Sequence, residues 1–214
     1  MPMIAKKYLS ILFTFLLLVS CQSNKLTAKK DPIYFPGKAL LILDIQKDFV
    51  ADNAAFPVDL KQLPALLQNI NQLTTWAQKN KVDVIYIQTT FAKSSWILNY
   101  FRNYAAIDGN VGTEFDPRMN MVSSNIFTKD SGNAFANPKL NLYLKQHKIG
   151  HLYISGVFAD QCVLASAKGA RALNFEVSVV IDAIAAKSDE DVDDAISKYI
   201  DLGFETVTTE RLTK

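Results

Sequence analysis

Six short runs typical of β-strands recur along residues 39–208 of this chain, and segments with helical periodicity separate most of them. The runs are residues 39–43, 82–87, 124–128, 152–155, 177–181 and 204–208. The first is apolar at every position, which is typical of a strand buried on both faces of a parallel sheet. Such runs, each needing cover on two sides, constrain the fold more strongly than any other feature of the sequence.

The segments between the runs carry the marks of helices. Residues 60–81 repeat leucine and isoleucine at spacings of three and four, which marks one apolar helix face. Asn137-Pro138 and Ser188-x-x-Asp191 are helix starts, followed by helices to about residues 147 and 202. This alternation predicts an α/β fold with three αβα layers and a mostly parallel, six-stranded, Rossmann-like sheet. Residues 89–115, rich in aromatics, are expected to form an irregular flap.

The first residues have the layout of a secretory signal rather than of a folded element. A short basic start is followed by a 12-residue apolar run, Tyr8–Val19, and then by Leu18-Val19-Ser20-Cys21, which resembles a bacterial lipobox. We expect residues 1–20 to be a signal peptide, residues 21–36 a lipidated Cys21 with a flexible tether, and residues 37–214 a single globular domain. A plain signal anchor is the alternative.

This layout also predicts location and partners. Gln22 after the lipidated cysteine favours the outer membrane, with the domain facing the periplasm or the cell surface and the lipid as its membrane contact. Removing residues 1–20 takes Lys+Arg from 23 to 21, against 21 Asp+Glu. The mature chain is formally neutral, so its charge gives no case for binding nucleic acid.

The stretch from Tyr153 to Ala165 is the main candidate for chemistry. An apolar run ends at Gly156, and a helical pattern that Asp160 would cap begins just before Cys162. The N–H groups at a helix start favour thiolate over thiol, so Cys162 is placed to be a nucleophile. The structural alternative is a buried cysteine acting as a small apolar side chain. With Cys21 lipidated, Cys162 has no disulfide partner.

A cysteine nucleophile usually needs a base, but the two histidines are badly placed for it. His151 starts the strand that ends at Gly156, so at ~3.3 Å per residue it lies about 16 Å away, and His147 precedes that strand. The other ionisable groups at strand ends are Asp44, Lys129 and Asp182. An aspartate can accept the thiol proton, and a lysine can keep that aspartate ionised. A turn aspartate and a solvated lysine are the structural alternatives.

Four sequence motifs, taken together, resemble the isochorismatase-like cysteine hydrolases over residues 38 to about 212. They are Asp44-Ile-Gln46-Lys-Asp48-Phe49, Gly112-Thr-Glu114, Phe127-Thr-Lys129 with Ala134-Phe135, and Gly156-Val-Phe-Ala-Asp160-Gln-Cys162-Val. Each motif is weak alone, but their order and spacing match the family. The resemblance implies a small-molecule substrate, and it makes a homo-oligomer a partner to consider because relatives often form dimers or tetramers.

The resemblance also implies a role for each site residue. Asp44, Lys129 and Cys162 would form a catalytic triad, and the backbone N–H groups of Phe158 and Cys162 would form an oxyanion hole beside a cis peptide bond between Val157 and Phe158. The substrate-binding residues would be Gln46, Phe49, Phe135 and Phe158. The reaction implied is hydrolysis of a small amide, imide or ureido C–N bond through a thioester.

The sequence departs from nicotinamidases of the family at their metal site. Those enzymes use an Asp-x-His pair after the second strand and a further histidine, whereas Thr90 and Ala92 occupy the matching positions here. We therefore expect no metal and no cofactor, and a substrate other than nicotinamide. Two further functions stay open on the same fold: a ligand-binding lipoprotein without catalysis, and a thiol redox sensor.

Overall fold

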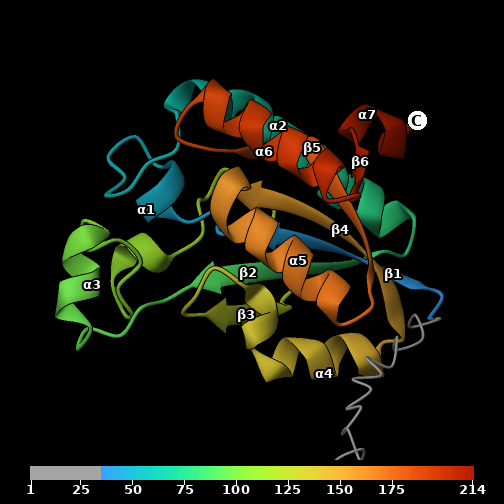
Figure 1. Ribbon diagram of the computed structural model, residues 1–214, viewed down its shortest axis with the longest axis horizontal. Coiled ribbons are helices and arrows are strands. Elements are labelled where there is room, and N and C mark those ends of the chain that lie inside the picture. Colours follow the sequence, from blue (N-terminus) through green and yellow to red (C-terminus); the bar gives the residue numbers. More distant parts are fainter. Residues whose placement is uncertain (1–34) are drawn as a thin grey trace, which may run out of the picture. The chain divides into compact units, whose positions relative to one another are not determined.

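The computed structural model describes residues 35–214, which contain one six-stranded sheet between two layers of helices (Figure 1). The strand order is β3-β2-β1-β4-β5-β6, and every neighbouring pair is parallel. The strands are β1 (Gly37–Leu43), β2 (Asp83–Thr89), β3 (Ile126–Lys129), β4 (Ile149–Val157), β5 (Glu176–Ala185) and β6 (Glu205–Val207). This confirms the predicted αβα fold class.

The two faces of the central strands pack against different helices. Alternate residues of β1, Leu40 and Ile42, face a core built with α2 (Leu63–Lys79), onto which Leu212 of α7 (Thr209–Thr213) also packs. Leu41 and Leu43 face the opposite core, which is completed by α4 (Pro138–Gln146), α5 (Leu164–Ala172) and α6 (Asp189–Asp201). From Ala39 to Leu43 both faces of β1 are fully buried, which is why these five residues are all apolar.

The predicted helix starts form as their side chains dictate. The Asn137 side chain accepts a hydrogen bond from the Lys139 N–H, with Pro138 as the first helical residue of α4. The Ser188 hydroxyl accepts from the Asp191 N–H at 3.1 Å and donates to the Asp191 carboxylate at 2.7 Å, and so caps the start of α6.

One strand end differs from the prediction. β5 continues past residue 181 to Ala185, so Asp182 lies inside the strand rather than at its end. The pairing partners jump from Ile154↔Val179 to Gly156↔Ile184, which marks a bulge in β5. Asp182 accepts hydrogen bonds from the Thr209 N–H and hydroxyl, so it anchors α7 and takes no part in a catalytic site.

The flap between β2 and β3 is irregular, as expected, and leaves apolar side chains uncovered. It contains α3 (Trp96–Phe101) and a single 3-10 turn, η2 (Val111–Thr113). Phe101 of α3 is 75% exposed, and Trp96 and Tyr100 are similarly open. Two further 3-10 turns, η1 (Leu60–Gln62) and η3 (Ala134–Ala136), and one short helix, α1 (Lys47–Val50), complete the connections with the turn η4 (Ala159–Val163).

The structure contains no helix within residues 35–214 that is long and apolar enough to cross a bilayer. The predicted signal peptide, Cys21 and nearly all of the predicted tether lie outside the described residues.

Candidate active site

Four polar residues from four different segments meet at the carboxyl edge of the sheet. Asp44 follows β1, Thr89 ends β2, Lys129 ends β3, and Cys162 follows β4. These strands are neighbours, so their carboxyl ends bring the side chains together. Asp44 has a left-handed backbone with φ of 59°, a conformation that aspartate adopts more readily than most residues.

The Lys129 ammonium contacts each of the other three groups. Its Nζ lies 2.9 Å from Asp44 Oδ2, 3.2 Å from Cys162 Sγ and 2.5 Å from Thr89 Oγ1. Thr89 Oγ1 in turn donates to Asp44 Oδ1 at 2.9 Å. Asp44 and Lys129 are almost fully buried, and Cys162 is partly exposed. The three residues predicted as a triad are therefore in mutual contact, with sulfur as the member open to solvent.

The two oxygens of Asp44 differ in their contacts. Oδ1 accepts the Thr89 hydroxyl, whereas Oδ2 is buried and has no aligned hydrogen-bond donor among residues 35–214. Oδ2 lies 2.9 Å from Lys129 Nζ and forms an ion pair with it. A buried carboxylate oxygen with an unused lone pair, beside a thiol, can accept a proton.

The electrostatics of the cluster keep the resting thiol protonated. Burial and the Asp44 carboxylate raise the pKa of Cys162 to about 12, against the opposing effect of Lys129. Burial lowers the pKa of Lys129, but Asp44 and the sulfur outweigh it, so the pKa of Lys129 lies above its ordinary value and the ammonium is charged. The expectation that the helix start would favour a thiolate at Cys162 is therefore wrong, because burial and a neighbouring carboxylate oppose it.

The turn that carries Cys162 is a π-helical one. η4 leads from Phe158 directly into α5, and Phe158 is the residue at its N-cap position. Asp160 lies inside this turn and caps nothing, which corrects the prediction of an Asp160 cap. The buried Tyr199 hydroxyl of α6 donates to the Ala159 carbonyl and braces the turn. The Val157–Phe158 peptide bond is cis, at the position that the family resemblance indicates.

Thr89 is a site residue that the sequence reasoning missed. Its hydroxyl links the carboxylate and the ammonium, and it lines the cavity beside Cys162. The available signal was its position as the last residue of a buried strand next to β1. A threonine there was not distinguishable from an ordinary β-branched strand residue.

Gln46 is structural rather than substrate-binding, which corrects its predicted role. It is fully buried, and its side-chain carbonyl accepts from the Thr89 N–H at 2.7 Å. Its NH₂ group donates to the carbonyls of Thr89 and Thr113, both at 2.9 Å. All of these polar groups are occupied by backbone, so none is left for a ligand.

A small cavity of about 110 Å³ opens beside the thiol. Phe49 and Phe158, both predicted to contact substrate, line it together with Phe56 and Phe91. Phe158 packs edge-on against Phe49 and Phe56, with ring centroids 5.7 and 5.5 Å apart. Phe135 does not line this cavity. It is buried in the core against Phe175, so its prediction as a substrate contact is wrong.

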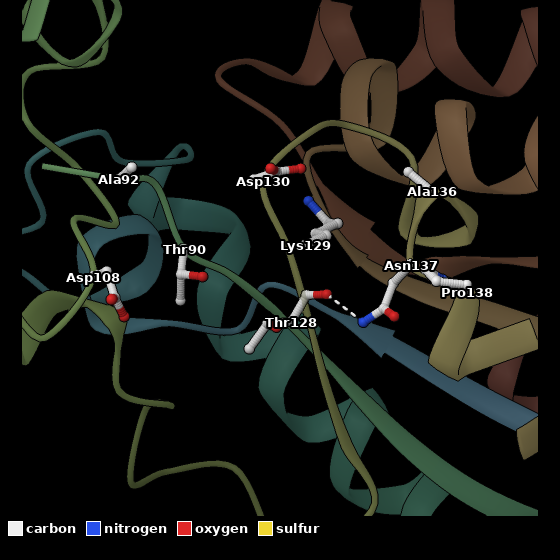
Figure 2. A pocket seen from close by; sticks show the side chains of 9 residues that line it. All are labelled: Thr90, Ala92, Asp108, Thr128, Lys129, Asp130, Ala136, Asn137 and Pro138. Carbon is white, nitrogen blue, oxygen red and sulfur yellow. Dashed lines mark hydrogen bonds between the residues drawn. The ribbon is translucent and has the colours of Figure 1, made fainter. Parts of the chain in front are cut away.

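A second, wider hollow of about 400 Å³ lies beyond the ends of β2 and β3 (Figure 2). Thr90, Ala92 and Asp108 line one side of it, and Thr128, Asp130 and Asn137 line the other, with the Asn137 amide donating to the Thr128 carbonyl at 2.8 Å. Its only carboxylates, Asp108 and Asp130, stand apart. Within the described residues no three His, Cys, Asp or Glu side chains converge as metal ligands.

The two histidines lie away from this edge. His151 is the third residue of β4 and contacts Ser178 at 2.7 Å, and His147 follows α4 and lies 3.0 Å from Asp83. Neither can act on Cys162. The donor set beside the cysteine therefore does not fit the metal cage described for nicotinamidases.

Comparison with known proteins decides the family. The family model for the isochorismatase domain matches residues 38–211. The chain belongs to the isochorismatase family. Its relatives include YaaI, an uncharacterized isochorismatase family protein of Bacillus subtilis, which is 25% identical over 174 residues, 81% of this chain and 94% of YaaI.

Two other relatives of this isochorismatase-family chain are informative. A probable inactive nicotinamidase of Arabidopsis thaliana is 26% identical over 163 residues, 71% of this chain and 82% of that protein. The crystal structure of an isochorismatase-like hydrolase from Alkaliphilus metalliredigens superposes with a TM-score of 0.72 at 22% identity, covering 83% of this chain and 97% of that one. The family and the fold are thus shown.

Proposed function

We propose that this protein hydrolyses the C–N bond of small amides through a cysteine thioester, without a metal. The observation that carries the proposal is the contact of Lys129 with both the Asp44 carboxylate and the Cys162 sulfur, at 2.9 and 3.2 Å, beside a cavity next to the thiol. Imides and ureido compounds have the same reacting group and are included.

The first half of the reaction transfers one proton and forms one bond. As Sγ of Cys162 attacks the amide carbon, its proton moves to Asp44 Oδ2, the oxygen without a hydrogen-bond donor. Lys129 remains charged and holds the carboxylate in place. The carbonyl oxygen becomes an oxyanion that the backbone N–H groups of Phe158 and Cys162 would stabilise. One such donor contributes about 2.7–4 kcal/mol to lowering a barrier of this kind.

The second half returns the site to its starting state. The C–N bond breaks as Asp44 gives its proton to the leaving nitrogen, which departs as ammonia or an amine and leaves a thioester on Cys162. Asp44 then takes a proton from water while the hydroxyl attacks the thioester carbon. The C–S bond breaks, the acid leaves, and the sulfur recovers its proton from Asp44.

The residues at the strand ends support a mechanism in which the protein's own groups carry every step. Asp44 supplies the base and acid, Lys129 the fixed positive charge, and Cys162 the nucleophile. Thr90 and Ala92, which stand where nicotinamidases of the family place metal ligands, offer a hydroxyl and a methyl group. This donor set does not fit a bound divalent cation.

Two other functions were open on this fold: a thiol redox sensor and a ligand-binding protein without catalysis. The site disfavours the redox sensor, so the non-catalytic binding protein is the alternative to test. Sensor cysteines are low-pKa thiols, whereas burial and Asp44 raise the pKa of Cys162. One relative is named a probable inactive nicotinamidase, so a binding protein without catalysis is the alternative that the experiment must separate from a hydrolase.

The test is ammonia release by the full-length protein across a panel of small amides. We expect Cys162→Ala to lower the rate on the best substrate by about a thousandfold or more, as loss of a catalytic nucleophile does. Mass spectrometry of the quenched wild-type reaction should show the acyl group on the Cys162 peptide. Equal rates for wild type and Cys162→Ala, or turnover abolished by a chelator, would contradict the proposal.

A further inference from the structure

Arg102 is the one cationic side chain lining the cavity of Cys162 that no carboxylate accompanies. It directly follows α3 in the flap, and its guanidinium carbon lies 3.7 Å from the centre of the Phe91 ring. Both Arg102 and Phe91 line the cavity, so the guanidinium rests on one wall of the space into which the thiol opens. The side chain is partly exposed.

The positive charge of Arg102 has no negative partner in the cavity. Asp44 is the only acid that lines it, and Asp44 is paired with Lys129 at 2.9 Å. Across residues 35–214, no carboxylate oxygen lies within 4.0 Å of the Arg102 guanidinium, and it donates no hydrogen bond. Arg118, by contrast, is held by Asp116 at 2.8 Å. A guanidinium in a partly closed aromatic pocket, left with all its donors, favours an anionic ligand group.

The walls and the size of the cavity limit the rest of the ligand. Four phenylalanine rings surround the thiol side, and the volume of about 110 Å³ is well below the roughly 300–1,000 Å³ of ordinary ligand pockets. A small substrate with a short apolar body fits this description. One end of it would reach Cys162 and the other Arg102.

We propose that Arg102 binds a carboxylate of the substrate, so that the preferred substrates are small amides bearing a carboxylate, such as the half-amides of short dicarboxylic acids. The inference rests on the proposed hydrolase function for its chemistry. A guanidinium matches a carboxylate with two parallel N–H···O bonds. A phosphate group carries about two negative charges, and this cavity offers one unpaired cation, so the carboxylate is the better match.

The matched substrates are succinamate and butyramide, which share the amide and the chain length and differ in the terminal carboxylate. We expect wild-type kcat/KM to favour succinamate by about tenfold or more. Arg102→Met, which keeps the stem on Phe91, should lower kcat/KM for succinamate by about ten- to hundredfold and change that for butyramide by less than about twofold. Arg102→Lys retains the positive charge but not the two parallel N–H donors of the guanidinium. Its kcat/KM for succinamate should lie between those of the wild type and Arg102→Met.

Lys187→Gln is the control for general charge effects. The Lys187 ammonium lies 3.8 Å from the centre of the Phe56 ring, on the outside of the same aromatic group, yet Lys187 does not line the cavity. It should leave the succinamate preference unchanged. Thermal unfolding followed by circular dichroism establishes that each variant is folded at the assay temperature.

A second measurement needs no turnover. Succinate should bind the wild-type protein in isothermal titration calorimetry, and its dissociation constant should be about tenfold or more higher for Arg102→Met. If no amide is hydrolysed but this Arg102-dependent binding is seen, the carboxylate site stands and the hydrolase proposal fails. If both amides are hydrolysed equally well, the carboxylate site is refuted and the hydrolase proposal stands. If Arg102→Met binds succinate like wild type, the carboxylate site is refuted, and the amide assays alone decide the hydrolase proposal.

Discussion

The reactivity of Cys162 is controlled by two neighbours with opposite effects. Burial and the Asp44 carboxylate raise the pKa of the thiol, and the Lys129 ammonium lowers it. At neutral pH the sulfur therefore carries its proton, and in the proposed reaction Asp44 removes that proton as the sulfur attacks the carbonyl carbon. This differs from enzymes in which a histidine pair keeps a thiolate ready.

The titration of Cys162 follows from this arrangement. Because its pKa is raised to about 12, the wild-type protein should show no thiolate from this residue up to at least pH 10. Asp44→Asn removes a raising effect and should make the thiolate appear at lower pH. Lys129→Met removes a lowering effect and should shift it higher still. The measurement is thiolate ultraviolet absorbance against pH, with Cys162→Ala subtracted to remove tyrosine ionisation. A titration midpoint of the wild-type thiol at about pH 8.5, the pKa of a free cysteine, would contradict the prediction.

The proposed reacting groups could be predicted better than their surroundings. The strand ends offered Asp44, Lys129 and Asp182 as ionisable candidates, and the resemblance to the family selected Asp44 and Lys129 as partners of Cys162. Gln46 and Phe135 lie within motifs of the family but serve the scaffold. Gln46 binds backbone of β2 and of the flap, and Phe135 fills the core. A sequence motif does not distinguish these two uses, because both need a particular side chain at a particular place.

The motif Gly112-Thr-Glu114, which lies in the flap, also serves the scaffold. A β-carbon at Gly112 would lie 2.0 Å from the Asp48 carboxylate, and Asp48 accepts the Ala106 N–H at 2.7 Å. Lys47 forms a 2.6 Å ion pair with Glu114. The first and second motifs are therefore interlocked, and together they hold the flap that presents Arg102.

At the level of elements, the close approach of β1 and β4 sets the distance between base and nucleophile. Gly156 has φ of +115°, and a β-carbon there would lie 2.1 Å from the Leu43 carbonyl oxygen, next to Asp44. The glycine allows the cysteine turn to leave β4 directly beside the end of β1. Any side chain at this position would push the two catalytic segments apart.

Gly156→Ala should therefore destabilise the fold by more than about 2 kcal/mol, from backbone strain and a backbone clash combined. Gly203→Ala is a matched control, because Gly203 also has positive φ, +71°, but a β-carbon there meets nothing within 4 Å. It should cost about 1 kcal/mol. The measurement is urea unfolding of both variants. Equal losses of stability would show that the contact with Leu43 is unimportant.

The order and type of the elements could be predicted, but their ends could not. The runs located all six strands. The central strands gave the strongest signal, because they are covered on both faces and are apolar on both, whereas the edge strands β3 and β6 are only partly buried. The bulge that carries β5 on to Ala185 depends on its pairing with β4, which is a long-range property. The π-helical turn around Cys162 likewise depends on support from Tyr199 of α6. Because both features are set by contacts distant along the chain, the residues next to them in the sequence do not predict them.

On the scale of the whole molecule, the topology separates the chemistry from the entry of the chain. β1 begins at Gly37, at the amino edge of the sheet, and the groups of the site lie at the carboxyl edge. The start of the described fold therefore lies at the opposite edge of the sheet from Asp44 and Lys129.

We propose that Cys21 is lipidated, from the basic start, the 12-residue apolar run and the Leu-Val-Ser-Cys sequence. Expressed in a bacterium with an alkyne analogue of palmitate, the full chain should incorporate the label and sediment with membranes. Cys21→Ser should lose the label, whereas Cys162→Ala should keep it and thus serve as the matched cysteine control. Because Cys21 lies outside residues 35–214, which contain all the proposed catalytic groups, Cys21→Ser should retain kcat/KM on a small amide within about twofold. Label persisting in Cys21→Ser, or absent from the wild-type chain, would show that the sequence Leu-Val-Ser-Cys does not direct lipidation here.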